Sequence, residues 1–349
     1  MRIAQIAPLY ESIPPKQYGG TERIVSYLTE ELVNMGLDVT LFASGDSVTK
    51  AELVGIVPEA TRMNERDPII YHLLLIEQLM ERIESFDIVH FSIDCIHFPI
   101  ARRLDVPHIT TLHGRLDLPD LIPFYEEFND IPVVSISNAQ RIPLPFANWQ
   151  GTVYHGLPKD LYKLNEKPDK YLVFLGRISI EKRPDRAIEI AKKSGMKLKI
   201  AAKIDKVDRE YFENVIKPLL DDPMIEFIGE ICEKDKQDFL GNALALLFPI
   251  DWPEPFGLVM IESLACGTPV IAYGNGSVPE IIDNGIDGFI VNSINSAVKA
   301  VSNIDLIDRK RCRQIFDQRF TSRLTAENYL NIYEKIIQNN QNRRAIYGI

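Results

Sequence analysis

The chain contains the stretch Glu254-Pro-Phe-Gly-Leu-Val-Met-Ile-Glu262, which continues as Ser263-Leu-Ala-Cys-Gly-Thr-Pro-Val-Ile-Ala272. Two carboxylates stand at the ends of its first part, and a Pro-Phe-Gly turn between them leads into an apolar helix. The helix is expected to stop at Gly267, before a buried strand at residues 269–273. Free N–H groups at a helix start favour negative charge, and fixed carboxylates accept hydrogen bonds from hydroxyl groups. The stretch therefore predicts a site for a polyhydroxylated, phosphorylated ligand.

Strands and helices alternate around this stretch. Apolar runs predict strands at residues 171–175, 198–202, 225–228 and 245–248, and amphipathic runs predict helices at 184–194, 208–220 and 234–242. Near-continuous apolar strands that alternate with helices are typical of a doubly wound parallel sheet.

The same alternation occupies the first part of the chain. Strands are expected at residues 3–7, 39–43, 87–91, 108–112 and 132–136, and helices at about 21–34, with Thr21 as the N-cap, and at 69–85. A last helix is expected at about 322–338, with a frayed tail after it. Two such α/β units, joined near residues 157–170, predict two Rossmann-like doubly wound domains that face each other across a cleft. Ligands bind such sheets outside the carboxyl ends of their strands.

Length, charge and composition exclude several classes of protein. A chain of 349 residues favours two domains, and 46% hydrophobic with 25% charged residues is ordinary for a globular protein. Residues 1–150 hold 11 Lys/Arg against 21 Asp/Glu, which argues against nucleic acid and, less strongly, against docking on an anionic membrane. The four cysteines are scattered and the first strand does not resemble a signal peptide, so a cytoplasmic, soluble protein is expected.

Cationic residues follow the first strand of the second unit. Gly176 and Arg177 come directly after that strand, and Lys182 precedes a helix that starts near residue 184. Cations between a strand end and a helix start neutralise a diphosphate. A solvated basic turn explains this segment alone equally well, but together with Glu254 and Glu262 the diphosphate is the better interpretation.

Two features stand at the corresponding places in the first unit. Gly19 and Gly20 precede a helix and allow a ligand close to the backbone, although a plain tight loop is about as good an interpretation. His113, at a strand end before Gly114, is the histidine best placed to face the cleft. His155, at the hinge, could also reach it, whereas the other histidines are expected to be structural.

The absence of three motifs limits the cofactors and reactions that the sequence favours. The sequence has no Asp-x-Asp, which disfavours the usual metal clamp for a nucleotide-sugar, so neither a metal nor another cofactor is expected. It has no Gly-x-Gly-x-x-Gly for a dinucleotide and no Gly-x-Ser-x-Gly for a hydrolase nucleophile.

These motifs together resemble the retaining GT-B glycosyltransferases of family 4, over nearly the whole chain. The Glu-x7-Glu motif of Glu254 and Glu262 is the most specific of them. Phe-Leu-Gly-Arg-Ile-Ser-Ile-Glu-Lys182 resembles the donor-diphosphate segment, Tyr18-Gly-Gly-Thr-Glu-Arg the N-terminal glycine loop, and Asn275-Gly-Ser-Val-Pro-Glu-Ile-Ile the segment after the motif. His155-Gly156-Leu157-Pro158 departs from the usual Asn-Gly-Val-Asp.

The resemblance implies a role for each matching residue. Arg177 and Lys182 would hold the diphosphate, Glu254 would bind the hydroxyls of the donor sugar, and Glu262 would bind the ribose. The remaining donor contacts would come from the backbone of Phe256, Gly257 and Leu258, from Glu230 and Ile231 beside the base, from His113 near the reacting face, and from Gly19 and Gly20 over the diphosphate.

The resemblance also implies the reaction and the substrate that each domain binds. Residues 1–157, with a C-terminal helix at about 323–349 packed back on them, would bind the acceptor, and residues 158–322 would bind the donor. A hexose would pass with retention and without metal from a nucleotide-sugar, with UDP-glucose favoured over GDP-mannose, to a saccharide, small-molecule or lipid-linked acceptor. An epimerase or phosphorylase of the same fold, and a non-catalytic binding protein, stay open as alternatives. Peripheral membrane contact is not supported by charge.

Overall fold

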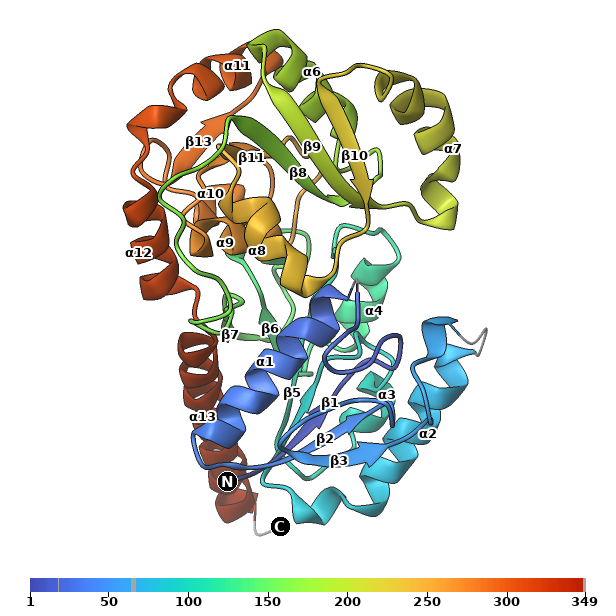
Figure 1. Cartoon of the computed structure of the whole chain (residues 1–349). Coiled ribbons are helices and arrows are strands. Elements are labelled where there is room, and N and C mark those ends of the chain that lie inside the picture. The colour runs from blue at the N-terminus through green and yellow to red at the C-terminus, as the bar shows by residue number, and fades with distance from the viewer. Residues whose placement is uncertain (18, 64–66, 348–349) are drawn as a thin grey trace. The chain divides into compact units, whose positions relative to one another are not determined.

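The computed structural model describes residues 1–17, 19–63 and 67–347, and the chain divides into two compact units (Figure 1). The first unit comprises residues 1–156 together with 322–349, and the second comprises residues 157–321. Of the helices in the described ranges, none has the length and hydropathy that a membrane span requires.

The first unit is built on a seven-stranded parallel sheet of order β3-β2-β1-β4-β5-β6-β7. Its strands are β1 (Arg2–Ile6), β2 (Asp38–Ala43), β3 (Glu52–Gly55), β4 (Ile88–Phe91), β5 (His108–Thr111), β6 (Val133–Ser135) and β7 (Trp149–Thr152). Its helices are α1 (Gly20–Asn34), α2 (Pro68–Glu81), α3 (Phe98–Ala101), α4 (Leu121–Glu127), α5 (Asn138–Arg141) and α13 (Ser322–Tyr347).

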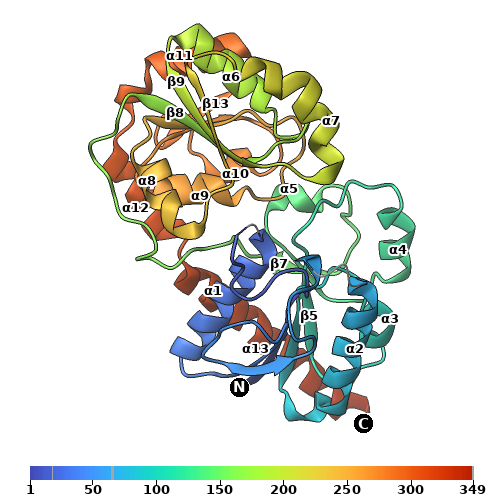
Figure 2. The same cartoon turned by 45° about the vertical axis from the view of Figure 1, so that its right-hand side comes forward.

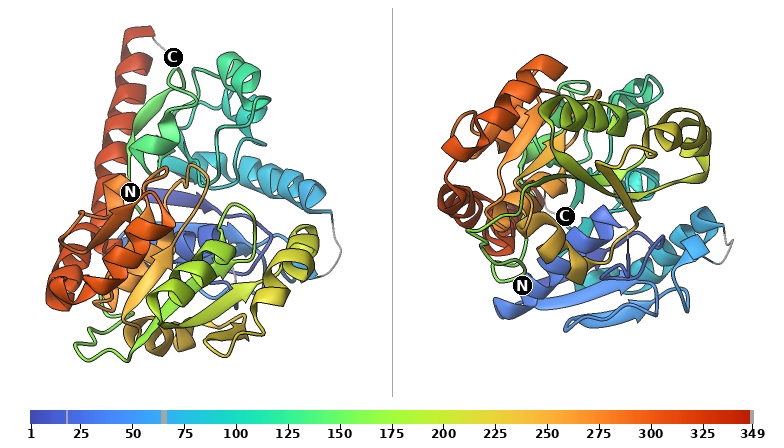
Figure 3. Two further views of the ribbon diagram at one scale, coloured as in Figure 1. Left: turned by 90° about the horizontal axis from the view of Figure 1, so that it is seen from above. Right: turned by 45° about the horizontal axis from the view of Figure 1, so that its top comes forward.

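Helices cover both faces of this sheet, because its central strands are apolar on both faces. Figure 2 shows α1 and α13 on one side of the sheet and α2 and α3 on the other. Leu28 and Leu32 of α1 share one buried cluster with Tyr329 and Tyr333 of α13. The left panel of Figure 3 shows α13 along its length. The segment that ends the chain therefore completes the core of the unit that begins it.

The second unit is built on a six-stranded parallel sheet of order β10-β9-β8-β11-β12-β13. Its strands are β8 (Tyr171–Arg177), β9 (Lys197–Lys203), β10 (Ile225–Gly229), β11 (Ala245–Phe248), β12 (Val270–Tyr273) and β13 (Gly288–Val291). Its helices are α6 (Pro184–Ser194), α7 (Arg209–Tyr211), α8 (Glu233–Gly241), α9 (Leu258–Ala265), α10 (Val278–Ile281), α11 (Ile294–Ser302) and α12 (Arg309–Arg319). Helices α6 and α11 lie on one side of this sheet, and α8, α9 and α12 lie on the other (Figure 2).

The predicted class, a doubly wound parallel α/β fold repeated twice, is confirmed, while several local predictions are wrong. Helix α1 begins at Gly20 and not after Thr21, since the N–H of Arg23 bonds to the carbonyl of Gly19 and closes the first turn. The expected helix at 208–220 is a series of short 3-10, α and π turns, and Pro218, which cannot donate a backbone hydrogen bond, lies in its last turn. The expected frayed tail is helical through Tyr347, because no Gly or Pro interrupts it before Gly348. Residues 348–349, the end of that tail, lie outside the described residues.

Candidate functional site

The strand order of the second unit fixes where a ligand binds. Strands β8, β9 and β10 follow one another toward one edge of the sheet, and β11, β12 and β13 follow one another toward the other edge. The switch point of the sheet therefore lies between the neighbours β8 and β11. The loops that leave the carboxyl ends of strands at a switch point form the binding crevice of this fold class. Arg177 ends β8, Lys182 lies in the loop after it, and Glu254 lies in the loop after β11. The structure therefore gathers three predicted site residues at the carboxyl ends of two adjacent strands.

Lys182 and Glu254 are in direct contact. The ammonium group of Lys182 donates a short hydrogen bond to Oε2 of Glu254, and both side chains are largely buried. Trp252 donates its indole N–H to the same carboxylate oxygen over 2.9 Å. The Lys182 ammonium also lies 5.0 Å from the Trp252 ring centroid and 5.6 Å from that of Phe248, within cation–π range. Sequence reasoning missed Trp252, although it stands two residues before Glu254.

The loop after β12 holds the Glu254 loop in position through hydrogen bonds and close packing. Ser277 donates its N–H to the carbonyl of Glu254 over 2.9 Å and its hydroxyl to the carbonyl of Phe256 over 2.7 Å. Gly276, at φ +57°, lies so close that a Cβ there would collide with the backbone of Glu254. The segment Asn275–Ile282, which in the sequence resembles the segment after the Glu-x7-Glu motif, therefore holds the Glu254 loop in place.

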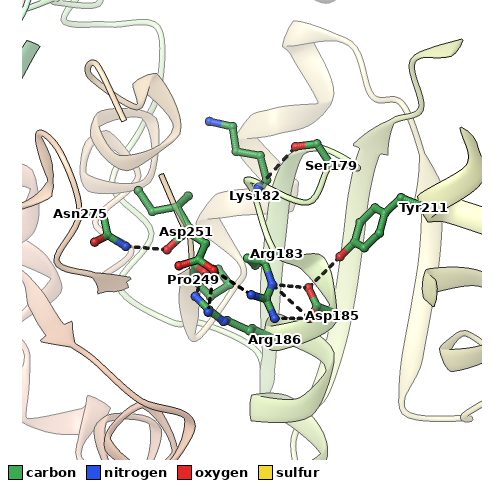
Figure 4. Close-up of polar contacts among 10 residues, drawn as sticks. Ser179, Lys182, Arg183, Asp185, Arg186, Tyr211, Pro249, Asp251 and Asn275 are labelled. Atoms are coloured by element: carbon green, nitrogen blue, oxygen red, sulfur yellow. Dashed lines mark hydrogen bonds and ion pairs between the residues drawn. The ribbon is translucent and has the colours of Figure 1, made fainter. Parts of the chain in front are cut away.

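A network of charged side chains connects the two loops (Figure 4). The N–H of Asp251 donates 2.8 Å to the carbonyl of Glu181, and the Asp251 carboxylate accepts 2.9 Å hydrogen bonds from both Arg183 and Arg186. Arg183 also binds Asp185, which accepts a 2.7 Å bond from Tyr211. In Figure 4 the Lys182 side chain extends away from this network. The network therefore holds the loops together and leaves Lys182 directed at Glu254.

Arg177 has different neighbours from Lys182. Its guanidinium lies 3.3 Å from Glu181 and 3.7 Å and 3.6 Å from Asp205 and Asp208, which lie in the segment after β9. Burial raises the pKa of Asp208, and the charge of Arg177 opposes that rise. The predicted loop position of Arg177 is wrong, because β8 extends through Arg177, which pairs with Lys203 of β9. Its guanidinium is surrounded by carboxylates and makes no ion pair with Glu254 among the described contacts.

The start of α9 provides the predicted backbone groups. Gly257, the N-cap of α9, has the left-handed backbone (φ +83°) that favours glycine, and no described side chain caps this helix. The first N–H groups of a helix without a cap are donors for an anion. The Phe256 side chain is buried against Phe320, so Phe256 offers its backbone here, and Leu258 is the first residue of α9.

Glu262, in the middle of α9, is paired with a lysine that the sequence did not single out. Lys236 of α8 donates a 2.7 Å hydrogen bond to Oε1 of Glu262, whose side chain is only 4% exposed. Glu230 and Ile231, predicted to border the base, follow β10 directly and precede α8. Of the other predicted donor-binding residues, Glu230 and Ile231 therefore lie at the carboxyl end of β10, and Glu262 lies on α9 beside α8.

The remaining predicted residues lie in the first unit. Gly19 precedes α1 and packs so tightly on Pro15 that a Cβ there would lie 2.7 Å from the proline Cβ, and Gly20 is the first residue of the helix. Tyr18, from the same segment of the sequence, lies outside the described residues. The loop that follows β1 is therefore closely packed where it enters α1.

His113 follows β5 and is stacked on His155, with ring centroids 5.4 Å apart. Its Nε2 lies 3.3 Å from the hydroxyl of Ser92. Burial lowers the pKa of His113 to about 4 and that of His155 well below its ordinary value. Both rings are therefore neutral near pH 7, so His113 can exchange hydrogen bonds with a ligand but carries no charge.

Carboxylates do not gather into a metal site in the described ranges, where no cluster of three or more His, Cys, Asp or Glu side chains is suitable for a metal ion. The acidic side chains discussed above are instead paired with Lys182, Lys236 and the arginines.

Comparison with known proteins identifies the family. Residues 159–318 match the family model described as glycosyl transferases group 1, and residues 18–142 match that of Glycosyltransferase Family 4. An uncharacterized glycosyltransferase of Methanocaldococcus jannaschii, MJ1178, is 23% identical over 94% of this chain and 98% of its own.

Two solved structures share the fold. Sucrose-phosphate synthase from Thermosynechococcus elongatus superposes with a TM-score of 0.79 at 16% identity, over 97% of this chain and 100% of its own. HepE of Anabaena, crystallised with UDP, superposes with a TM-score of 0.73 at 15% identity, over 96% of this chain and 100% of its own. With two family models that match in succession and the GT-B fold, this chain belongs to the group 1 glycosyltransferases, glycosyltransferase family 4.

Proposed function

We propose that the protein transfers a hexose from a nucleotide-sugar to an acceptor hydroxyl, with retention at the anomeric carbon and without a metal ion. The observation that carries the proposal is the contact of Lys182 with Glu254 at the switch point of the second sheet. It places a cation and a hydrogen-bond acceptor side by side, one suited to a phosphate and the other to sugar hydroxyls.

The chemical difficulty of the reaction is the departure of a diphosphate from an oxocarbenium-like carbon. Negative charge develops on the leaving oxygen, and fixed positive groups near it stabilise the transition state. In this proposal Lys182, Arg177 and the first N–H groups of α9 supply that stabilisation. Their charge takes the place that a divalent metal would otherwise have.

Retention follows if both bonds change on one face of the sugar. The bond from the anomeric carbon to the phosphate oxygen breaks, and the bond to the acceptor oxygen forms on the same face. The acceptor proton passes to the departing phosphate oxygen. Glu254 holds the sugar hydroxyls during this exchange, and neutral His113 is assigned to the reacting face as a hydrogen-bonding group, consistent with its lowered pKa.

UDP-glucose is the proposed donor, with GDP-mannose second, and the support is a likeness of fold. Structures of HepE of Anabaena contain UDP and UDP-glucose. Glu230 and Ile231 are assigned to the border of the base and Glu262 to the ribose. The first unit is assigned to the acceptor, and Gly19 and Gly20 are assigned to the diphosphate and the acceptor.

The test is release of nucleoside diphosphate from UDP-, GDP- and ADP-linked glucose, galactose, N-acetylglucosamine and mannose, with and without a mixed acceptor pool and EDTA. The proposal expects acceptor-dependent release from UDP-glucose that EDTA does not reduce, and an α-linked product by NMR. Inhibition by EDTA would contradict metal independence, and a β-linked product would contradict retention. Sugar interconversion without release would favour an epimerase, and phosphate-dependent release would favour a phosphorylase.

A further inference from the structure

Glu262 is a buried carboxylate with a single strong cationic partner. Its side chain is 4% exposed, that of Lys236 is 14% exposed, and the ammonium group lies 2.7 Å from Oε1. A carboxylate that has left water needs a compensating charge and hydrogen bonds. Among the described residues no hydrogen bond is made to its second oxygen, Oε2. Lys236 therefore balances the charge of Glu262 and leaves one acceptor oxygen for a ligand.

Lys236 is itself held in place. Its ammonium group lies 3.2 Å from Oε2 of Glu233, one helical turn earlier on α8. The other oxygen of Glu233 accepts a short hydrogen bond from the hydroxyl of Tyr162, which is 2% exposed. Lys236 is thus fixed between two carboxylates, and the more distant carboxylate is anchored by a buried tyrosine. A lysine so constrained fixes the orientation of Glu262 in turn.

We propose that Lys236 is a positioning residue that sets the preference of this enzyme for ribonucleotides over deoxyribonucleotides. The inference rests on the proposed function, which assigns the ribose of the donor to Glu262. Lys236 occupies Oε1 and keeps Oε2 directed at the ribose hydroxyls. An ionised carboxylate accepts hydrogen bonds and donates none, so both of its oxygens require donors.

The proposal predicts a measurable selectivity. A hydrogen bond to a charged group contributes about 10- to 100-fold in binding, so a nucleotide without the hydroxyl that faces Glu262 should bind weaker by about that factor. Without Lys236, the carboxylate loses its fixed partner and turns toward solvent. Its oxygens then no longer face the ribose in a fixed orientation, and the selectivity is lost.

The experiment is isothermal titration calorimetry on the full chain. The probes are UDP, GDP and ADP, and then the 2′-deoxy and 3′-deoxy forms of the nucleotide that the wild type binds best. The variants are Lys236→Met, which keeps the side chain as far as Cε but removes the ammonium group, Lys236→Arg, which keeps its charge, and Glu262→Gln. Lys234→Met is the matched control, because Lys234 is exposed on the same helix and forms none of the ion pairs found among the described residues.

The expected result is a preference of about 10-fold or more for the ribonucleotide over at least one deoxy form in the wild type, Lys236→Arg and Lys234→Met. In Lys236→Met the preference should fall below about 3-fold, as in Glu262→Gln, and the double variant should lose nothing further. Circular dichroism and a thermal midpoint for each variant confirm that it folds. If Lys236→Met is misfolded, the other variants decide the question. Lys236→Arg should then keep the preference, as Lys234→Met does, and Glu262→Gln should lose it.

Three results would overturn the inference. A wild type that binds the ribo and deoxy forms equally shows that Glu262 does not select the ribose, and leaves the transfer reaction standing. A Lys236→Met variant that keeps the wild-type ratio, even with weaker binding overall, shows that Lys236 has only a structural role. A wild type that binds none of the nucleotides contradicts the proposed function itself, and the inference with it.

Discussion

The backbone N–H of Asp251 donates a 2.8 Å hydrogen bond to the carbonyl of Glu181, and this bond ties together the two loops at the switch point of the second sheet. Lys182 is the next residue on one loop, and Glu254 lies three residues further along the other. The position of the cation relative to the carboxylate is therefore set by the link between the loops, and not by either loop alone. Changes that disturb this link should affect catalysis more than folding.

Lys182→Ala should lower the rate of transfer by about two orders of magnitude, because a lost cation at a developing anion costs ~3 kcal/mol in the transition state. The measurement is kcat for release of nucleoside diphosphate with a saturating donor. Lys197→Ala is the control, since Lys197 is exposed at the opposite, amino end of β9. A Lys182→Ala rate within about threefold of the wild type would remove Lys182 from the mechanism.

Arg177→Ala tests the second cation in the same assay. Arg177 lies among Glu181, Asp205 and Asp208, so its removal leaves a cluster of carboxylates where the diphosphate is proposed to bind. Both donor affinity and kcat should fall, and the loss should shrink when salt screens the carboxylates. Unchanged turnover would contradict the assignment of Arg177 to the diphosphate.

Gly276→Ala should destabilise the second unit and weaken donor binding together. The new methyl group would overlap the backbone of Glu254, so the Glu254 loop must shift, at a cost of about 2–4 kcal/mol in unfolding free energy. Gly285→Ala is the matched control, because Gly285 also has positive φ (+80°) but has nothing within 4 Å of the added Cβ. It should lose about 1 kcal/mol and keep normal donor affinity. Equal behaviour of the two variants in thermal unfolding and calorimetry would show that the Glu254 contact is unimportant.

Asp251→Asn tests the network that connects the loops. The variant removes the negative charge between Arg183 and Arg186, and because Asp251 is half exposed the loss of stability should be at most about 1 kcal/mol. Turnover should nevertheless fall about 3- to 10-fold, since Arg183 adjoins Lys182 in the chain. Asp222→Asn, which weakens the ion pair with Lys192 at the other end of the sheet, should leave turnover unchanged. A selective loss of stability in Asp251→Asn, with full turnover, would contradict a role in positioning.

The first unit should lose stability in acid because of its buried histidines. His90 lies between the hydroxyls of Tyr333 and Thr111, and burial lowers its pKa to about 3. The unfolded chain binds a proton at the ordinary pKa of 6.5 and the folded chain does not, so stability is complete above pH 6.5 and falls as the pH drops toward 3. By pH 5 the loss from His90 is about 2 kcal/mol. The raised pKa values of Glu22 and Asp94 act in the opposite direction.

The test compares His90→Gln, which keeps hydrogen-bonding groups but does not titrate, with the wild type in chemical unfolding at pH 7 and pH 5. The variant should lose about 2 kcal/mol less than the wild type between these two pH values. Parallel losses would show that His90 does not cause the acid sensitivity. In the same way, the pKa of His113 near 4 predicts a rate profile with no inflection from this residue between pH 6 and pH 7.

The central strands could be predicted from the sequence, and of the edge strands β10 was predicted but β3, β7 and β13 (Gly288–Val291) were not. Strands such as β11 and β12 are buried throughout and are therefore continuous apolar runs. Strands β3 (Glu52–Gly55) and β7 (Trp149–Thr152) lie at the edges of their sheet and are only partly buried, so no apolar pattern identifies them. Their place depends on the neighbour with which they pair, which is a property of the whole fold.

The site was predictable where it is local in the chain. Glu254, Gly257 and Glu262 lie in one short stretch, where a loop, a helix start and two carboxylates can be recognised together. Lys236 was missed because it meets Glu262 only through the packing of α8 beside α9, across 26 positions of sequence. The same holds for Asp205 and Asp208 beside Arg177, which come from the segment after a different strand.

The most direct test of the account is acceptor-dependent release of UDP from UDP-glucose by the wild type and by Glu254→Gln in the presence of EDTA. The account predicts release by the wild type that depends on the acceptor and persists in EDTA, and a loss of about two orders of magnitude or more in Glu254→Gln with UDP itself still bound. Equal release by Glu254→Gln and the wild type would contradict the central claim that Lys182 and Glu254 form the donor site.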